Sequence, residues 1–220
     1  MDEIKHLVDE VHGWLTHSEG QLLFRLAKAC TGRGVIVEIG SWKGKSTIWL
    51  AKGSRSGNKV KIHAIDPHTG SPEEAKSYGK VLTFEEFTAN VKNAGVDDTV
   101  IPIIKTSSEA AQEFREPIEL IFIDGDHQYD MVKLDFELWF PKVIDGGIMA
   151  FHDTIWTWDG PKKVVKEWVY KSKHFTNAKF LDTITFAEKV AQNGIKDRIM
   201  NRLTLSLKDL YEFGHPRVRH

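Results

Sequence analysis

The sequence predicts an α/β fold with a doubly wound, mostly parallel sheet of seven strands and helices on both faces. Short apolar, β-branched runs alternate with helical periodicities along the chain. Nearly every apolar run ends in an acid, a histidine or a glycine. The strand-like runs are 35–40, 59–66, 99–106, 118–124, 146–153 and two runs between 175 and 190. Ligands of such Rossmann-like sheets bind beyond the carboxyl ends of the strands, so the residues that end the strands are the informative ones.

The helical spacing of apolar residues accounts for the segments between these strands. The expected helices are 3–16, 18–30, 44–53, 83–95, one opened by Ser107 or Ser108, 129–140, 160–172 and 195–213. Ser18 and Thr83 are candidate N-caps, each with a glutamine or glutamate three residues later. Pro102 requires an edge position or a bulge in its strand. Residues 67–82, which contain two prolines and two glycines, are expected to form a loop or lid.

Length and composition indicate one main domain with small additions. We expect an N-terminal helical extension at 1–32, a central domain at 33–192 and a C-terminal helical tail at 193–220. The formal charge of -1 gives no basic excess for a nucleic-acid partner. The single cysteine, Cys30, excludes an internal disulfide framework and a thiolate zinc cluster. No apolar run approaches the ~18 residues of a membrane span, so we expect a soluble, cytoplasmic protein with no membrane partner.

The loop after the first strand, EIGSWKGKST, ends like a phosphate-binding loop. Only three residues separate Gly40 from Gly44, whereas a phosphate loop needs four. Trp42 occupies the place of the second glycine in a dinucleotide-binding fingerprint. The pattern that remains is Glu38-x-Gly40-x-x-x-Gly44. It suits a ligand with a cationic amino group and no phosphates, because Glu38 would repel a pyrophosphate but pair with an ammonium group.

Asp66 ends the second strand, 26 positions after Gly40. An acid at this place can accept hydrogen bonds from both hydroxyls of a ribose. Dinucleotide-binding folds and other adenosine-binding folds share this feature, so it indicates adenosine without choosing the ligand. The other interpretation is that Asp66 caps the turn before Pro67.

With these motifs, residues 33 to 190 resemble the class I S-adenosylmethionine-dependent methyltransferases. VEIGSWKGKSTIWLA looks like their first motif, and HAIDP like the acidic end of their second strand. IFIDGDHQYDMVKLDFELWFPKVIDGGIMAFHD is similar to a bacterial subgroup near the macrocin and rhamnosyl O-methyltransferases, and more distantly to the catechol-type enzymes. The resemblance implies S-adenosylmethionine as the methyl donor. The donor-binding residues that it implies are Glu38, Gly40, Ser41, Gly44, Ser46, Asp66, Ser107, Ser108, Asp124 and Asp126.

The resemblance also implies a divalent cation, usually Mg²⁺, because many of these relatives bind one. Their first ligand ends the fourth strand, which here is Asp124, and two more end the fifth strand, where this sequence has His152 and Asp153 in place of a carboxylate pair or an Asp-Asn pair. Three interpretations stay open. The two aspartates hold Mg²⁺ with waters and the acceptor's oxygens, or His152 joins them to hold a softer metal. In the third, no metal binds and His152 acts on the acceptor proton.

Methyl transfer from a sulfonium is an in-line displacement, for which the protein supplies alignment. A hydroxylated acceptor must also lose a proton. His127 is the expected base, because histidine titrates near neutrality and because it aligns with the lysine taken as the base in the catechol-type relatives. Asp124 is the second expected catalytic residue. The other interpretation of His127 is a residue at the start of a helix that bonds local carbonyls.

We therefore expect an S-adenosylmethionine-dependent O-methyltransferase that acts on a small hydroxylated acceptor such as a sugar, a glycoside or a phenol. Trp156 and Trp158 either wall the acceptor pocket or pack their loop against the domain. The terminal helices are candidates for a homodimer interface. The rival hypotheses are an NAD-dependent oxidoreductase and a non-methylating, metal-dependent or adenosyl-binding relative.

Overall fold

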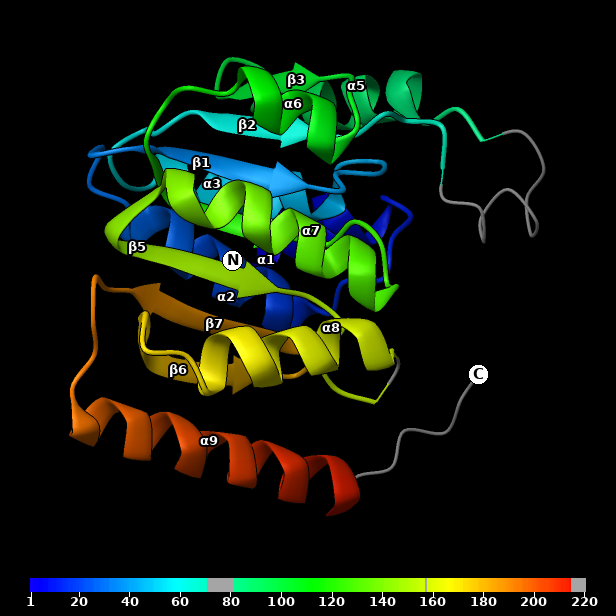
Figure 1. Ribbon diagram of the computed structural model, residues 1–220. Helices are drawn as coiled ribbons and strands as arrows, with labels where there is room; N and C mark the ends of the chain where they lie inside the picture. The colour runs from blue at the N-terminus through cyan, green and yellow to red at the C-terminus, as the bar shows by residue number, and fades with distance from the viewer. Residues whose placement is uncertain (71–80, 157, 215–220) are drawn as a thin grey trace.

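A computed structural model describes residues 1–70, 81–156 and 158–214, and its centre is a seven-stranded sheet (Figure 1). The strands are β1 (Val35–Ile39), β2 (Ile62–Ile65), β3 (Val100–Ile103), β4 (Ile118–Ile123), β5 (Val143–Phe151), β6 (Phe175–Leu181) and β7 (Ile184–Lys189). Their order is β3-β2-β1-β4-β5-β7-β6. The first five strands are parallel, and β7 runs antiparallel to both β5 and β6. This confirms the predicted fold class.

Helices cover both faces of the sheet (Figure 1). They are α1 (Asp2–Asp9), α2 (His17–Ala29), α3 (Lys45–Arg55), α5 (Phe84–Asn93), α6 (Ser107–Glu113), α7 (Tyr129–Trp139), α8 (Asp159–Val164) and α9 (Ile195–Gly214). A 3-10 turn, η1 (Phe140–Lys142), follows α7, and a π-helix, η2 (Val165–Tyr170), continues α8. Among the described residues, no helix is both long enough and apolar enough to span a bilayer.

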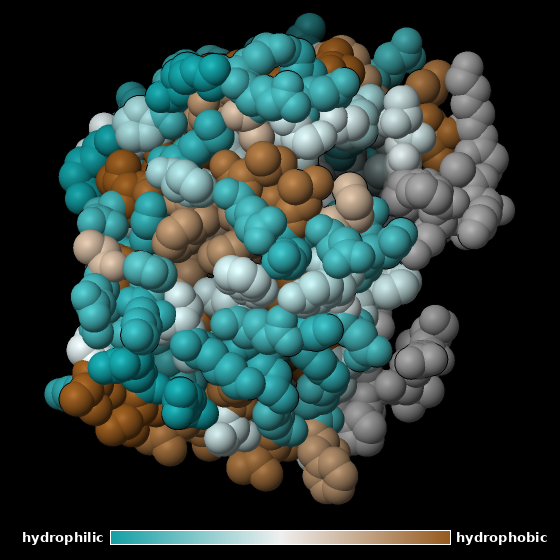
Figure 2. Space-filling view, viewed as in Figure 1, coloured by the Kyte–Doolittle hydropathy of each residue, from teal (hydrophilic) through white to brown (hydrophobic). Residues whose placement is uncertain are grey.

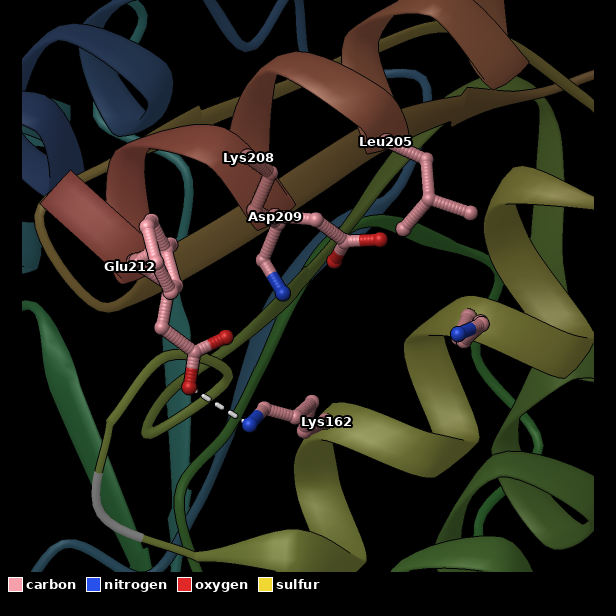
Figure 3. A pocket seen from close by; sticks show the side chains of 7 residues that line it. Lys162, Leu205, Lys208, Asp209 and Glu212 are labelled. Atoms are coloured by element: carbon pink, nitrogen blue, oxygen red, sulfur yellow. Dashed lines mark ion pairs between the residues drawn. The ribbon is translucent and has the colours of Figure 1, made fainter.

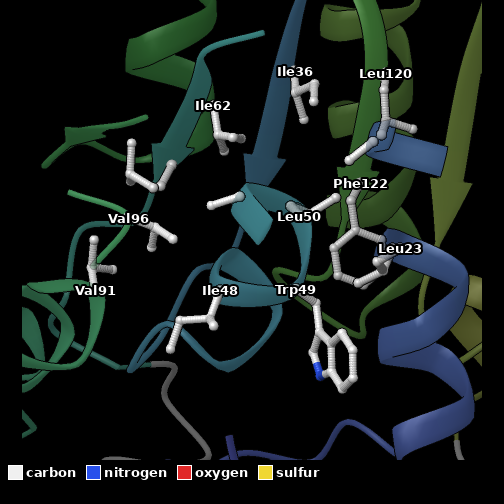
Figure 4. Packing of buried hydrophobic residues seen from close by; sticks show 14 of the residues in the cluster. Leu23, Ile36, Ile48, Trp49, Leu50, Ile62, Val91, Val96, Leu120 and Phe122 are labelled. Atoms are coloured by element: carbon white, nitrogen blue, oxygen red, sulfur yellow. The ribbon is translucent and has the colours of Figure 1, made fainter. Parts of the chain in front are cut away.

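Two apolar cores separate the sheet from its helices, because alternate side chains of each strand point to opposite faces. Ile36, Leu120 and Phe122 pack with Leu23 and Trp49 on the side of α2 and α3 (Figure 4). The intervening strand residues pack on the other side, against α6, α7, α8 and η2; they include Val37, Ile39, Ile121 and Ile123. Burial on both faces explains why these strands are continuously apolar in the sequence.

The strand order reverses between β1 and β4, and the carboxyl ends of these two strands approach one another closely. Gly40 follows β1 with φ +86°, and its N–H donates to the Ile65 carbonyl over 2.9 Å. A Cβ atom at Gly40 would lie 2.0 Å from the backbone oxygen of Asp124. The glycine is therefore required by the close passage of backbone beside β4.

Three local predictions were wrong. α1 ends at Asp9 instead of continuing to residue 16. The cap of α2 is Thr16, not Ser18: the Thr16 side chain accepts from the Glu19 N–H and the Glu19 carboxylate bonds back. Thr83 precedes α5, but no side-chain capping bond is found there among the described residues, and its hydroxyl pairs with His68 Nδ1 at 2.8 Å. The edge position expected of Pro102 is confirmed in β3.

The terminal helices pack on the sheet. Leu22 and Leu23 of α2 belong to the core on the β1 face. In α9, the Asn201 side chain accepts from the Ala178 N–H and donates to the Phe175 carbonyl of β6. The three-part division of the chain stays a prediction. Of the predicted loop at 67–82, residues 71–80 lie outside the described part, as do residues 215–220 of the predicted tail.

Candidate active site

The functional side chains lie at the carboxyl ends of β1, β2, β4 and β5 and form two adjoining groups. We call Glu38, Ser41 and Asp66 the donor group, and Asp124, His152 and Asp153 the metal group. Coulombic interaction links them, because the carboxylates of Asp124 and Asp66 both act on Glu38. Acids as far apart in the sequence as Glu38 and Asp153 therefore meet at one edge of the sheet, as parallel strands require.

Glu38 is fully buried beneath the start of α3. The Thr47 hydroxyl donates to its Oε2 atom over 2.5 Å, whereas Oε1 has no hydrogen-bond partner among the described residues. Burial, and then the charges of Asp124 and Asp66, raise the pKa of Glu38 to about 7. The buried Ser41 hydroxyl also has no partner within the described part of the chain. The two orphaned oxygens fit a ligand that brings a cation or hydrogen-bond donors.

The raised pKa of Glu38 makes stability depend on pH. A carboxyl group whose pKa rises from 4.5 to about 7 on folding holds its proton more tightly in the folded state. The free energy of unfolding therefore falls as pH increases through that window. Glu38→Gln should remove this component, which amounts to about 3 kcal/mol between pH 4 and 8. Urea unfolding of both proteins at several pH values measures it, with the exposed Glu85→Gln as the surface control; an unchanged pH slope in Glu38→Gln contradicts the assignment.

Asp66 holds the two turns that border the donor group. Its Oδ2 atom accepts from the Trp42 N–H over 2.8 Å, and its Oδ1 atom accepts from the His68 N–H over 2.6 Å. A carboxylate has about four lone-pair positions, so two remain for ribose hydroxyls. The turn-capping interpretation is correct as far as these contacts go, and it is compatible with the ribose interpretation.

Ser107 and Ser108, which are expected to lie near the adenine of the donor, begin α6 after its N-cap, Thr106. The Ser107 hydroxyl donates to Asp135 over 2.5 Å and accepts from Trp139 Nε1 over 2.8 Å. The Ser108 hydroxyl lies 3.3 Å from the Thr106 hydroxyl. Ser107 thus joins α6 to α7 in this structure, and the adenine role of both serines stays a prediction.

The remaining expected donor residues lie at the start of α3 and in the loop between β4 and α7. Gly44 is the N-cap of α3 with φ +91°. Ser46 is buried in the first turn of α3, and its side chain acts to lower the pKa of Glu38. Asp126 accepts from the Gln128 N–H over 2.7 Å and shapes the turn that leads into α7. Direct contact of these three residues with a donor stays a prediction.

The structure brings the three expected metal ligands together. His152 Nδ1 lies 3.1 Å from Asp124 Oδ1 and 3.3 Å from Asp153 Oδ2, and the candidate ligand atoms are all within 4.8 Å of one another. Burial alone would lower the pKa of His152, but the Asp124, Asp153 and Glu19 carboxylates raise it well above its ordinary value. Two carboxylates and an imidazole fit a divalent cation, which would replace that proton.

His127 belongs to the same network. Its Nε2 atom lies 3.1 Å from Asp153 Oδ2, and its ring stacks on Trp158 with centroids 4.5 Å apart and planes 8° apart. Burial raises the pKa of Asp153, but the bonds from His127 and His152 outweigh it and lower the pKa below the ordinary range. An ionised Asp153 therefore orients the ring of His127. The role of His127 as a base stays a prediction.

The two tryptophans after β5 have different surroundings. Trp156 packs on α9: its backbone N–H and its indole N–H both donate to Glu212, and its ring contacts Tyr211. Trp158 is 37% exposed and covers His127. The packing interpretation therefore fits Trp156, whereas a place for Trp158 in the wall of an acceptor pocket stays a prediction.

The loop that carries Trp156 is also held from α9 by a buried lysine. Lys208 Nζ donates to the Thr154 carbonyl over 2.5 Å, and burial lowers the pKa of this amine to about 8. Beside it, a pocket of about 320 Å³ opens between α8 and α9, and the Lys162–Glu212 ion pair closes one side (Figure 3). Contacts from α9 thus fix the backbone directly after the metal group.

Two residues of the site were missed by sequence reasoning. Glu19 of α2 lies 3.5 Å from His152 Nε2, and its only sequence signal was the Thr16-x-x-Glu19 capping pattern. His68 is buried beside Asp66, and burial lowers its pKa. Neither residue ends a strand, so neither is found by searching for polar residues at the carboxyl ends of strands.

Comparison of the sequence with known protein families finds one that matches the part of the chain that carries the site. Residues 37–154, which are 118 of the 220 residues, match the family described as a methyltransferase domain. An uncharacterized protein of Acanthamoeba polyphaga mimivirus is 28% identical over 153 residues, and one of Sinorhizobium fredii is 30% identical over 151. Each alignment covers 68% of this chain, but 65% of the first relative and 16% of the second.

Solved structures share the fold at low identity. The O-methyltransferase NovP superposes with a TM-score of 0.68 at 16% identity and covers 86% of this chain and 88% of its own. The O-methyltransferase TomG from Streptomyces achromogenes, solved in complex with S-adenosylmethionine, has a TM-score of 0.60 at 16% identity, covering 86% of this chain and 87% of its own. At these identities the likeness establishes the arrangement of the sheet and helices alone.

Proposed function

The chain belongs to the methyltransferase domain family, and from that premise we propose that it transfers a methyl group from S-adenosylmethionine to a hydroxyl oxygen of a small acceptor. The donor-group geometry is the observation that carries the proposal. NovP and TomG are O-methyltransferases on the same fold, and TomG was solved with this donor. The acceptor class proposed is a sugar, a glycoside or a phenol.

The charges at the strand ends favour this donor over a nicotinamide dinucleotide. The charges of Asp66 and Asp124 act on Glu38, and Glu38 has a buried oxygen without a described partner. S-adenosylmethionine brings a sulfonium and an ammonium group, which such a site attracts. A dinucleotide brings a pyrophosphate, which the same carboxylates repel. The oxidoreductase hypothesis is therefore disfavoured by charge as well as by the family match.

The chemistry is an in-line displacement at the donor's methyl carbon. The acceptor oxygen forms a bond to that carbon while the carbon–sulfur bond breaks, and its electron pair stays on sulfur, which leaves a neutral thioether. The acceptor proton passes to the imidazole of His127, whose cationic form the Asp153 carboxylate stabilises at Nε2. A divalent cation held by Asp124, His152 and Asp153 would supply Lewis acidity that lowers the pKa of the acceptor hydroxyl.

A labelled donor tests the reaction. The protein is incubated with S-adenosylmethionine carrying a ¹³C methyl group and with panels of sugars, glycosides and phenols, and the products are examined by mass spectrometry and NMR. The proposal requires the label on an acceptor oxygen together with one equivalent of S-adenosylhomocysteine. Saturable binding of NAD without binding of S-adenosylmethionine would contradict it and favour the oxidoreductase. Donor binding without transfer to any panel would favour a non-methylating relative.

Asp66→Ala should weaken donor binding by about 1.5–3 kcal/mol, the range for hydrogen bonds to a charged group. The expected cause is the loss of the ribose contacts. Calorimetric titration with S-adenosylmethionine measures the change. Thr83→Val is the matched control, because it disturbs the same turn through His68 without touching the carboxylate. Equal affinities of Asp66→Ala and the wild type, in folded proteins, would refute the ribose role.

We also propose that α9 forms a homodimer interface. Its outer face carries seven large apolar residues, each at least 53% exposed, which we call the α9 stripe: Ile195, Ile199, Met200, Leu203, Leu207, Leu210 and Phe213. Figure 2 shows such brown residues along the lower edge of the molecule, where α9 lies. A helix that displays apolar residues outward, while Asn201 and Lys208 lie on its buried face, has the pattern of an interaction surface.

A second copy of the chain matches the α9 stripe. Under a two-fold axis near Leu205 the stripe meets itself, in the pairs Ile195–Phe213, Ile199–Leu210 and Leu203–Leu207. The same antiparallel arrangement brings Arg198 and Arg202 in the first half of α9 towards the second half of the partner's helix, where Asp209 is exposed.

Light scattering tests the dimer at micromolar concentration. The wild type should have the mass of two chains, and Leu203→Glu should have the mass of one with unchanged circular dichroism. Lys28→Glu, an exposed charge change on α2, is the control and should stay dimeric. A monomeric wild type, or a stripe that binds lipid vesicles in place of a second copy, would overturn the proposal. A cytoplasmic location and the absence of a nucleic-acid partner stay predictions from composition.

A further inference from the structure

A fourth carboxylate, Glu19, lies behind the metal group. Its Oε2 atom accepts from the Thr16 N–H over 2.9 Å, and its Oε1 atom accepts from the Thr183 N–H over 3.0 Å and from the Thr183 hydroxyl over 2.6 Å. The side chain is 1% exposed. Both carboxylate oxygens act as acceptors in these bonds, as the oxygens of an ionised carboxylate do. Glu19 is therefore a rigidly held anion.

This anion faces one side of the His152 ring. Its Oε2 atom lies 3.5 Å from His152 Nε2, and that nitrogen has no hydrogen-bond partner among the described residues. A negative charge beside Nε2 favours the tautomer with the proton on Nε2. The lone pair of the neutral ring is then on Nδ1, the atom that points at Asp124 and Asp153.

On the other side of the ring there are more acceptors than donors. One Nδ1 atom lies 3.1 Å from Asp124 Oδ1 and 3.3 Å from Asp153 Oδ2, and the latter oxygen is also bonded by His127. A single N–H cannot serve both carboxylates well. Two ligand atoms about 2.1 Å from a shared ion and at right angles are about 3.0 Å apart. The observed separations therefore suit a cation at this point.

We propose that Asp124, His152 and Asp153 bind a first-row divalent transition metal in preference to Mg²⁺, and that Glu19 positions His152 to bind it through Nδ1. A carboxylate behind a metal-binding histidine is a common arrangement that fixes the tautomer and raises the basicity of the ring. Imidazole nitrogen suits Fe, Co, Ni or Zn, whereas Mg²⁺ prefers oxygen ligands. The role of the metal, which is to activate the acceptor, rests on the proposed function. The binding of the metal does not.

Metal affinity tests the choice of ion. The full chain is stripped of metal and titrated calorimetrically with Mg²⁺, Co²⁺ and Zn²⁺ in the absence of donor and acceptor. Co²⁺ and Zn²⁺ should bind on the order of 100-fold more tightly than Mg²⁺, and His152→Asp should reduce that ratio by about tenfold or more. A ratio below tenfold in the wild type, or one that His152→Asp leaves unchanged, overturns the preference.

A double-mutant cycle tests the positioning role of Glu19. Glu19→Gln should lower the affinity for Co²⁺ by about 10–100-fold, as losses of such outer partners do. In the His152→Asp background the same change should have no effect on metal affinity. Thr183→Val is the matched control: it loses one bond to Glu19 but keeps the carboxylate, so it should lower the melting temperature and leave Co²⁺ affinity unchanged. Equal losses in both backgrounds overturn the role.

Should Glu19→Gln not fold, the wild type decides the question. Long-range ¹H–¹⁵N NMR of the zinc-bound protein should show the His152 proton on Nε2 and a zinc-shifted Nδ1, and the opposite tautomer overturns the inference. The tests also separate this inference from the proposed function. Methyl transfer by a protein that binds no metal refutes the inference alone. Metal binding as described, with no methyl transfer to any acceptor, refutes the proposed function alone.

Discussion

His127→Ala should lower the turnover number by about 10²–10⁴-fold, the usual contribution of a positioned general base. His127 is oriented by the ionised Asp153 at Nε2 and by the Trp158 ring, so it is prepared to take the acceptor proton. Donor affinity should change little, because Glu38, Ser41 and Asp66 belong to the other half of the site. Steady-state kinetics at saturating donor, together with calorimetric donor titration, measures both quantities.

The exposed His6 of α1 provides the matched control, and His6→Ala should keep wild-type turnover. The pH dependence gives a second readout. If His127 is the base, the acidic limb of the pH–rate profile should disappear in the variant. A variant with wild-type turnover on its true acceptor would show that His127 is not the base. A loss confined to donor affinity would place it in the donor group.

Gly40→Ala should destabilise the folded protein by about 2–5 kcal/mol. The left-handed backbone at φ +86° costs an alanine about 1–2 kcal/mol, and overpacking adds about 1–3 kcal/mol. The new Cβ atom would lie 2.0 Å from the Asp124 backbone oxygen and 2.6 Å from its carbonyl carbon, so β1 and β4 must separate at their carboxyl ends. The donor group and the metal group would then be displaced from one another. Denaturant unfolding and donor titration measure the two effects.

Gly32→Ala isolates the cost of the backbone conformation alone. Gly32 also has a positive φ, +90°, but a Cβ atom there meets no described atom within 4 Å. It should therefore cost only about 1–2 kcal/mol and leave donor binding intact. Equal destabilisation by the two substitutions would mean that the contact with β4 relaxes freely, contrary to the close packing inferred here.

The fold was predictable because its strands are buried on both faces and alternate with helices. The run at 118–123 is apolar at every position except Glu119, and it lies at the centre of the sheet. Boundaries were less predictable where two caps compete. Thr16 and Ser18 are both hydroxyl residues, and two bonds make Thr16 the cap: its side chain accepts from the Glu19 N–H, and its own N–H donates to the Glu19 carboxylate. Thr83 was mistaken for a capping side chain because its partner, His68, lies 15 positions away.

The position of the site was predictable to the extent that its residues end strands. Parallel topology gathers such residues, and Asp124, His152 and Asp153 do lie together. Glu19 was not predictable in this way, because it lies on a helix whose approach to β5 depends on the packing of the whole face. Ser107 shows the converse: its place near a strand end suggested a ligand contact, whereas its hydroxyl bonds α7. The roles of all these residues in binding and catalysis stay predictions.

Two distant backbone amides share the Glu19 carboxylate as their hydrogen-bond acceptor, and this affects their hydrogen exchange. The amides of Thr16 and Thr183 both donate to this carboxylate, one at the start of α2 and one at the turn between β6 and β7. Local opening of either turn would withdraw a bond from the anion that faces His152. Protection of these two amides therefore reports on the order of the site from positions that touch neither ligand nor acceptor. Slower exchange at both amides on addition of Co²⁺ would make them a spectroscopic gauge of metal occupancy.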